Sequence, residues 1–330
     1  MSDSLAFISA DWLCAWLDHM GYPQPLPGQP VLLFAEGTIP RFETAQGGRR
    51  WPSPAPGDWG DLWEGIGGEL VGLEVVPNAL DQFNDAGLLL WVDGGSAVHI
   101  GVFFGSVNPG SVLSSRYGWP QLGDGAHRYF RSGFLKKDAH GRVIYDNGQA
   151  VIDKDRPALC SPNNRCGREI PVIEGVGGDL VLTLSEVIKR GLAANSSILA
   201  HPGRKPTFSA GCPLTSGTKD DVVWRAIWGH TGESGAWVIR HNGIDLSRWV
   251  RSGGAAHVPP LMRPGCNARR WMVPVQRAHG VTPDGVFGPL TAASLLQSRL
   301  ARGLDRATAE HPSINHGDWS ALGLPFVRPS

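Results

Sequence analysis

The chain has 330 residues, of which 42% are hydrophobic and 18% are charged, which is the composition of a folded globular protein. Its 30 basic and 30 acidic residues cancel, so no overall electrostatic field would draw the chain onto nucleic acid or an anionic membrane. The 44 glycines, 26 prolines and 13 tryptophans indicate many turns and short strands, and so favour a β-rich architecture.

The five cysteines are an odd number and include no CxxC pair, so they form neither a disulfide framework nor a zinc ribbon. Two of them, Cys160 and Cys166, flank the short loop CSPNNRC. This pair either closes a small disulfide loop in an oxidising compartment or remains two reduced thiols.

The first twenty residues predict an amphipathic helix, because apolar residues recur every three or four positions, at Leu5, Ile8, Trp12, Trp16 and Met20. No basic segment precedes them and aspartates interrupt them, unlike a secretory signal peptide. The apolar run GLLLWV is too short to span a bilayer. We therefore expect synthesis in the cytoplasm and no membrane insertion. Action at the cell wall or in the periplasm would then require release or delivery.

The stretch from 22 to 60 is rich in proline and glycine, which predicts irregular structure packed on a neighbour. With the preceding helix, it makes residues 1–70 an N-terminal extension. Three tryptophans in this part, Trp51, Trp59 and Trp63, are typical of packing, and the alternative is a groove that binds glycan.

From 71 to 255, short apolar runs alternate with turn signals, which predicts a mostly antiparallel β domain. Asn147 and Gly148 lie between two such runs, and this pair is a strong signal for a two-residue hairpin turn. The segment SEVIKRGLAA predicts one helix with Ser185 as its N-cap.

A small helical domain is predicted from 262 to 305, with one helix, a tight Asp284-Gly285 turn and a second helix. Residues 306–330 show no usable pattern and are assigned as a tail.

The motif in this domain, VQRAHGVTPDGVFGPLTAASLLQ, closely resembles the small peptidoglycan-binding domain found on many cell-wall enzymes. The resemblance implies that Gln276, Asp284 and Phe287 bind the substrate as part of a wall-binding module. Most of the motif also makes sense as scaffold, because Gly285 permits the turn and Phe287 anchors it. The alternative is a helical module that has lost wall binding.

The stretch HPGRKPTFSAGCPL places His201 eleven residues before Cys212. A thiol near its free pKa of about 8.5 is mostly protonated at neutral pH, so a cysteine nucleophile needs a base, and His201 is the nearest one. The amides of Gly211 and Cys212 are candidates for holding an oxyanion, and Ser209 for orienting the loop. Alone, this pair fits two ordinary loop residues as well as a nucleophile and its base.

Two other arrangements of this chemistry stay open. His230 and His241 follow the cysteine, as the base does in papain-like enzymes, so either is an alternative base. A zinc site containing His201 and Cys212 would need two more ligands, and the spacing does not indicate them. We therefore assign no metal and no other cofactor.

Six segments between residues 75 and 225 form a recognisable series: FNDAGLLLWVDGG, VFFGSVNPG, LGDGAHRYFRSGF, VIDKDRPAL, ILAHPGR and above all SAGC. They resemble a phage and prophage family that looks like a divergent branch of L,D-transpeptidase-type catalytic domains. The resemblance implies a catalytic domain with an L,D-transpeptidase-like sheet or sandwich. It also implies that Cys212 attacks a peptide carbonyl of the peptidoglycan stem while His201 serves as base.

The chain departs from that family in three respects. Ala210 stands where ordinary L,D-transpeptidases carry a second histidine, and Phe134-Leu135 replaces a histidine of the middle strand. The spacing from histidine to cysteine is also shorter. These departures bear on the acyl acceptor and on efficiency more than on the nucleophile.

Together the two resemblances predict a mainly β cysteine enzyme that acts on peptidoglycan as carboxypeptidase, endopeptidase or transpeptidase. Its settings would be a phage lysin or a secreted antibacterial effector, with a phage particle or secretion system as carrier. Arg204 and Arg128 are assigned to substrate binding. The guanidinium fork of Arg128 matches a stem-peptide carboxylate, and the alternative for Arg128 is an ordinary exposed arginine of a strand. The alternatives are a non-catalytic wall-binding protein of a phage particle and a zinc-dependent cell-wall peptidase.

Overall fold

The computed structural model describes most of the chain. The described residues are 5–46, 49–51, 62–77, 81–108, 121–160, 171–173, 182–194, 198–204, 212–254 and 259–324.

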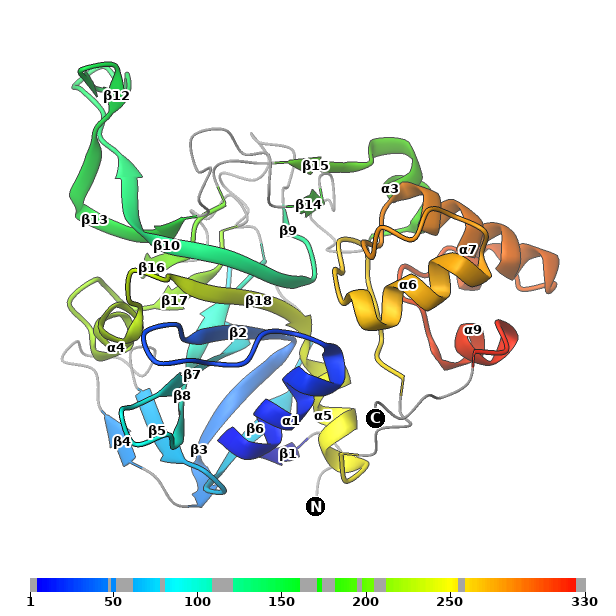
Figure 1. Ribbon diagram of the computed structural model, residues 1–330, viewed down its shortest axis with the longest axis horizontal. Coiled ribbons are helices and arrows are strands. Elements are labelled where there is room, and N and C mark those ends of the chain that lie inside the picture. The colour runs from blue at the N-terminus through cyan, green and yellow to red at the C-terminus, as the bar shows by residue number, and fades with distance from the viewer. Residues whose placement is uncertain are drawn as a thin grey trace.

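The architecture is mainly β and is built on one large, nearly closed sheet, which we call the barrel (Figure 1). Its strands follow the order β13 (Ile152–Cys160), β10 (Gly125–Leu135), β18 (Ala236–Asn242), β2 (Val31–Glu36), β7 (Asp85–Val92), β8 (Val98–Ser106), β17 (Leu214–Ser216) and β16 (His201–Gly203). A bridge between Leu159 and Ala200 links β13 to the residue before β16, and so brings the two ends of the sheet together. Neighbours are antiparallel except β18 with β2 and β16 with β17. The predicted β-rich fold is confirmed at this level.

Strand β2 shows why the sheet is stable, because all six of its residues are buried. Since side chains alternate along a strand, its two faces enter different cores. Leu32 and Phe34 belong to the cluster that α4 (Val222–His230) covers. Val31 and Leu33 belong to the cluster covered by α1 (Ala10–Met20) and α5 (Gly243–Arg251).

Smaller sheets and a hairpin complete the β structure. One small sheet joins β1 (Leu5–Ile8), β6 (Leu70–Val75) and β3 (Thr38–Gln46). Another joins β15 (Leu192–Ala194), β14 (Pro171–Ile173) and β9 (Gln121–Leu122). The large sheet is extended beside β8 by β5 (Leu62–Ile66), which pairs in turn with β4 (Arg49–Trp51). The predicted hairpin is confirmed between β11 (Tyr145–Asp146) and β12 (Gln149–Ala150). Asn147 and Gly148 have φ values of 47° and 76°, as a type I′ turn requires.

The N-terminal seventy residues are not an extension, which corrects the predicted domain plan. Strand β2 lies inside the large sheet between β18 and β7, so the barrel cannot close without it. The first helix is also shorter than predicted, because Ser9 caps it and Leu5–Ile8 pair with β6 instead. Trp63 is 3% exposed and packs in the core, which agrees with the packing interpretation. Trp59 and the side chain of Trp51 lie outside the described residues.

The prediction for the helix near Ser185 needs a smaller change. Helix α3 (Leu184–Arg190) is capped by Thr183 rather than by Ser185, and Glu186 completes a capping box with Thr183. Ser185 instead binds Glu310, from the segment predicted to be a tail.

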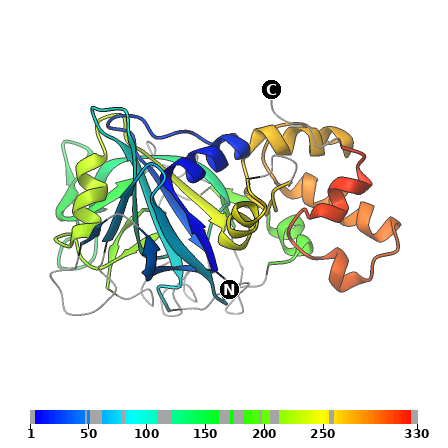
Figure 2. The same ribbon diagram turned by 90° about the horizontal axis from the view of Figure 1, so that it is seen from below.

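The C-terminal helices α6 (Arg269–Ala278), α7 (Pro289–Ala301), α8 (Arg306–Ala309) and α9 (His316–Ala321) lie beside the barrel (Figures 1 and 2). The predicted tail forms part of this helical module, because Arg299 of α7 is 1% exposed and pairs with Asp318 of α9 at 2.5 Å. A buried guanidinium needs such partners, so the module extends past its predicted end at 305.

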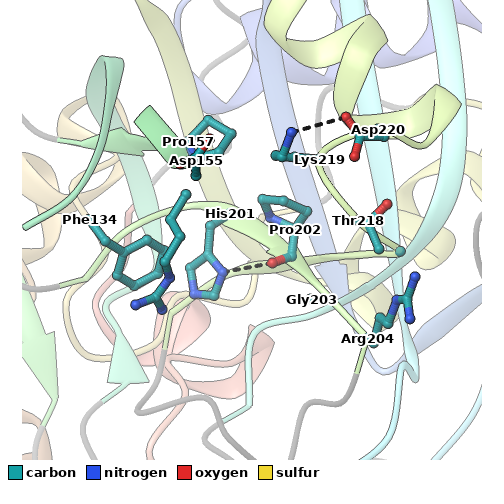
Figure 3. A pocket seen from close by; sticks show the side chains of 12 residues that line it. Phe134, Asp155, Pro157, His201, Pro202, Gly203, Arg204, Thr218, Lys219 and Asp220 are labelled. Atoms are coloured by element: carbon teal, nitrogen blue, oxygen red, sulfur yellow. Dashed lines mark hydrogen bonds and ion pairs between the residues drawn. The ribbon is translucent and has the colours of Figure 1, made fainter. Parts of the chain in front are cut away.

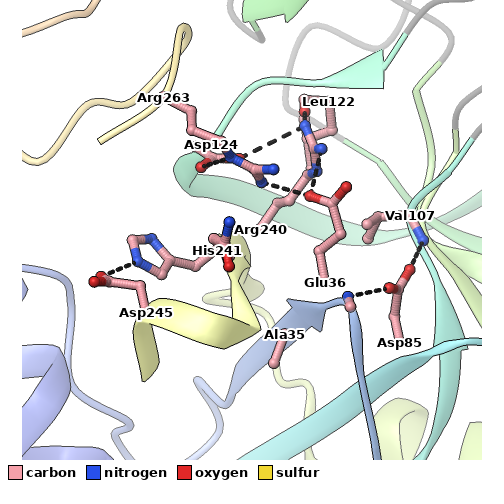
Figure 4. A network of polar contacts seen from close by, with 12 residues as sticks. Ala35, Glu36, Asp85, Val107, Leu122, Asp124, Arg240, His241, Asp245 and Arg263 are labelled. Carbon is pink, nitrogen blue, oxygen red and sulfur yellow. Dashed lines mark hydrogen bonds and ion pairs between the residues drawn. The ribbon is translucent and has the colours of Figure 1, made fainter. Parts of the chain in front are cut away.

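A buried ion network fastens the helical module to the barrel (Figure 4). Arg240 of β18 lies 2.6 Å from Glu36 at the end of β2, and Arg263, which precedes α6, lies 2.8 Å from Asp124 and also contacts Glu36. Burial alone would raise the pKa of Glu36, but the two guanidinium groups outweigh it and lower the pKa to about 2. The carboxylate is therefore ionised at neutral pH.

None of the helices in the described part of the chain combines the length and apolar character needed to cross a membrane.

A candidate cysteine–histidine site

The edge of the large sheet brings the predicted base and nucleophile segments side by side. Strands β16 and β17 run parallel with His201 opposite Leu214, and the N–H of His201 donates to the carbonyl of Pro213 at 3.2 Å. Cys212 directly precedes that proline. Ser209 and Gly211 lie outside the described residues, so their predicted roles stay predictions.

The imidazole of His201 is held in one tautomer. Its Nδ1 lies 2.9 Å from the carbonyl oxygen of Pro202. A carbonyl can only accept, so Nδ1 carries the hydrogen, and the neutral ring keeps its lone pair on Nε2. Burial lowers the pKa of His201 to about 4, against the raising effect of that hydrogen bond. The ring is therefore neutral at pH 7 and able to accept a proton.

Cys212 is 6% exposed and lies in a small apolar cluster with Ala158, Cys160 and Leu199. The N–H of Leu199 donates to its Sγ at 3.4 Å. Burial raises the pKa of Cys212 to about 11, because the desolvation of the thiolate outweighs that hydrogen bond. Cysteine and histidine are thus both neutral at pH 7, and a proton would have to move as the sulfur attacks.

A pocket of about 380 Å³ opens beside His201 (Figure 3). Its lining residues are Phe134, Asp155, Arg156, Pro157, His201, Pro202, Gly203, Arg204, Gly217, Thr218, Lys219 and Asp220. Phe134 lines this pocket and also packs against the cluster that contains Cys212. Its ring centroid lies 4.8 Å from that of His201, at an interplanar angle of 74°. Phe134 is therefore part of the pocket lining and also part of the packing around Cys212.

Of the two arginines assigned to substrate binding, the structure brings one to this site. Arg204 lines the pocket. Arg128 is not among the lining residues; its guanidinium donates to the carbonyl of Ser234 and lies 5.1 Å from the ring of Trp237. Sequence reasoning missed Arg156, which faces the pocket from β13 and has no motif of its own.

The two alternative bases lie elsewhere. His230 stacks on Trp91 with ring centroids 4.4 Å apart at the end of α4. His241 is 1% exposed, lies 2.9 Å from Asp245 and packs on Trp16, in the core covered by α1 and α5. Neither lines the pocket beside His201.

The motif residues of the helical module have internal partners. The amide of Gln276, which is 1% exposed, donates to Asp284 at 2.7 Å and to Val286 and accepts from Gly285 at 2.8 Å. Phe287 is fully buried. These contacts support the scaffold interpretation of the motif, and contact of these side chains with peptidoglycan stays a prediction.

Other predictions concern the remaining thiols and metal binding. Cys160 is a free thiol whose Sγ lies 3.8 Å from the carbonyl of Gly133, while Cys166 lies outside the described residues. Among the residues that the structure describes, no three His, Cys, Asp or Glu side chains gather as metal ligands would.

No family model, no curated protein and no solved structure matches the chain.

Proposed function

We propose that the protein is a cysteine enzyme of L,D-transpeptidase-like type that cleaves or exchanges stem-peptide bonds of peptidoglycan. The proposal is supported mainly by the environment of His201. This residue is a neutral histidine with its lone pair on Nε2, it lines a pocket, and its strand is paired with the segment that follows Cys212. The helical module beside the barrel carries a motif that resembles wall-binding domains, and this motif is the reason for proposing peptidoglycan as the substrate.

In the proposed reaction, Sγ of Cys212 attacks the carbonyl carbon of a stem-peptide amide while Nε2 of His201 takes the thiol proton. The backbone amide of Cys212 is a candidate donor to the oxyanion. The C–N bond then breaks, His201 returns the proton to the leaving amine, and a thioester remains on Cys212. Water or a second amine resolves the thioester, which gives hydrolysis or transpeptidation without a cofactor.

A second candidate function has an observation in its favour. Cys212 is buried and protonated, as a structural thiol would be, which suits a non-catalytic wall-binding protein. A phage lysin and an antibacterial effector delivered by a secretion system are two settings for the enzyme. A phage particle is the setting for the binding protein.

The test compares the wild-type protein with Cys212→Ala and with the matched control Cys160→Ala, whose thiol lies in the same apolar cluster. Each is incubated with peptidoglycan, and soluble products are identified by mass spectrometry. We expect Cys212→Ala to abolish product formation, His201→Ala to slow it by about 10²–10⁴-fold, and Cys160→Ala to retain it. Unchanged peptidoglycan that still sediments the wild-type protein would establish the binding protein instead.

A further inference from the structure

Asp85 is a fully buried residue whose carboxylate joins two segments of the barrel that are far apart in the sequence. Its Oδ1 accepts the N–H of Gly37, in the turn between β2 and β3, at 2.8 Å. Its Oδ2 accepts the N–H of Val107, the residue that follows β8, also at 2.8 Å (Figure 4). Buried N–H groups need acceptors, and an amide of the same shape has one acceptor oxygen instead of two. Both oxygens of the carboxylate therefore have a structural task.

The end of β8 that Asp85 holds is also the partner of the strand that follows Cys212. The last two residues of β8 pair with β17, where Leu214 lies opposite Ser106. On its other side, β17 pairs with β16, where Leu214 lies opposite His201. Ser106, Leu214 and His201 are therefore neighbours across three strands, and Cys212 lies two residues before Leu214. A shift of the end of β8 would be passed on to the segments of the proposed nucleophile and base.

The charge of Asp85 changes near neutral pH. Burial raises its pKa to about 7, and the carboxylate of Glu36 at the end of β2 adds to the rise. The N–H groups of Gly37 and Val107 act in the opposite direction, as does Arg240 of β18. Because these N–H groups lower the pKa, the ionised carboxylate in turn binds them more tightly than the protonated acid does. The proposed base and nucleophile, with pKa values of about 4 and about 11, keep their charge in this range.

We propose that Asp85 is a positioning residue of the reaction, and that its carboxylate holds the end of β8 so that β17 and β16 keep Cys212 and His201 in register. This inference rests on the proposed function. Asp85 acts through the N–H of Val107 and the pairing of β8 with β17. Loss of its acceptor oxygens should therefore loosen β17 first and leave distant strands of the barrel in place.

The first experiment follows the hydrogen exchange of single amides by NMR in the wild type, in Asp85→Ala, which removes both acceptors, and in Asp85→Asn, which keeps one. We expect Asp85→Ala to lower the protection of Val107 and of the β17 amides by about tenfold or more, because buried hydrogen bonds are lost. Asp85→Asn should have a smaller effect, and amides of β13 should keep their protection. Asp138→Asn is the control, because Asp138 also accepts two backbone N–H groups, in a solvent-exposed turn.

The second experiment measures the rate of product formation from peptidoglycan between about pH 5 and pH 9. The wild-type rate should rise through an inflection near pH 7, where Asp85 ionises and binds its two N–H groups more tightly. Asp85→Asn should react more slowly and lack the inflection, because an amide does not ionise. A residue that only stabilised the fold would lower the rate without removing an inflection. Asp138→Asn should keep the wild-type profile.

Four results would overturn the assignment of Asp85: free exchange of the Val107 amide in the wild type, equal protection of β17 in the wild type and Asp85→Ala, a wild-type profile without an inflection, or an inflection that survives in Asp85→Asn. The first and third need no variant, so they apply even if Asp85→Ala does not fold.

The proposed function fails on a different measurement, the comparison of products from wild type and Cys212→Ala. Loosening of β17 in Asp85→Ala, with no difference between those products, would keep Asp85 as the residue that holds β17 and reject the cysteine mechanism.

Discussion

The buried ion network and the pocket use arginine in opposite ways. Arg240 and Arg263 are surrounded by the carboxylates of Glu36 and Asp124, and they join two strands of the barrel to the segment before α6. The arginines of the pocket have no such partners in the described part of the chain. The difference indicates which charges hold the structure together and which are available to a ligand.

The largest effect is expected from breaking the network. Arg240→Met would leave Glu36 and Asp124 with a single guanidinium, and loss of one partner of a buried ion pair costs about 3–5 kcal/mol. We expect that decrease in the free energy of unfolding, measured by denaturant titration. Arg142→Met, at an exposed ion pair with Asp138, is the control and should change stability little. Equal effects of the two substitutions would show that the buried network contributes no more to stability than an exposed ion pair does.

The pH dependence of alkylation tests whether Cys212 and His201 are both neutral at pH 7. Alkylation needs the thiolate, and the pKa of Cys212 is raised to about 11. The rate of iodoacetamide addition to Cys212, followed by peptide mapping, should therefore rise about tenfold per pH unit between pH 7 and pH 9. It should level off only near pH 11. A plateau below pH 8 would show that Cys212 is a thiolate at neutral pH, contrary to this prediction.

The turn of the helical module should be stabilised by the amide of Gln276. Gln276→Ala leaves the buried N–H of Gly285 and one oxygen of Asp284 without this partner, at a cost of about 1–3 kcal/mol. Thermal unfolding would measure the loss, with Gln149→Ala in the exposed hairpin as the control. If peptidoglycan binding falls while stability does not, Gln276 contacts the polymer directly.

The smallest expected effect concerns access to the thiol. Because Phe134 packs on the Cys212 cluster and lines the pocket, Phe134→Ala should raise the alkylation rate of Cys212 several-fold. Tyr145→Ala, at an exposed position of the hairpin, is the control and should leave the rate unchanged. An identical rate in all three proteins would show that Phe134 does not cover the thiol.

Features that depend on neighbouring residues could be predicted from the sequence. The Asn147-Gly148 hairpin and the Asp284-Gly285 turn follow from local backbone preferences. The sequence also places only ten residues between His201 and Cys212, but the parallel pairing of β16 with β17 does not follow from that spacing.

Features that join distant residues could not be predicted. The parallel pairing of β2 with β18 joins residues about two hundred positions apart and leaves no periodic signal. The contact between Arg263 and Glu36 spans 227 positions. Arg156 resembles any exposed strand arginine until the fold places Phe134 beneath it.

The proposed reaction requires a covalent bond between Cys212 and a stem peptide. Mixing the protein with a stem tetrapeptide, quenching in acid and mapping the cysteine-containing peptides by mass spectrometry would detect this bond. We predict a thioester on Cys212 that persists in Cys160→Ala and is absent from Cys212→Ala. Product formation without an adduct on Cys212, or an adduct confined to another cysteine, would contradict it.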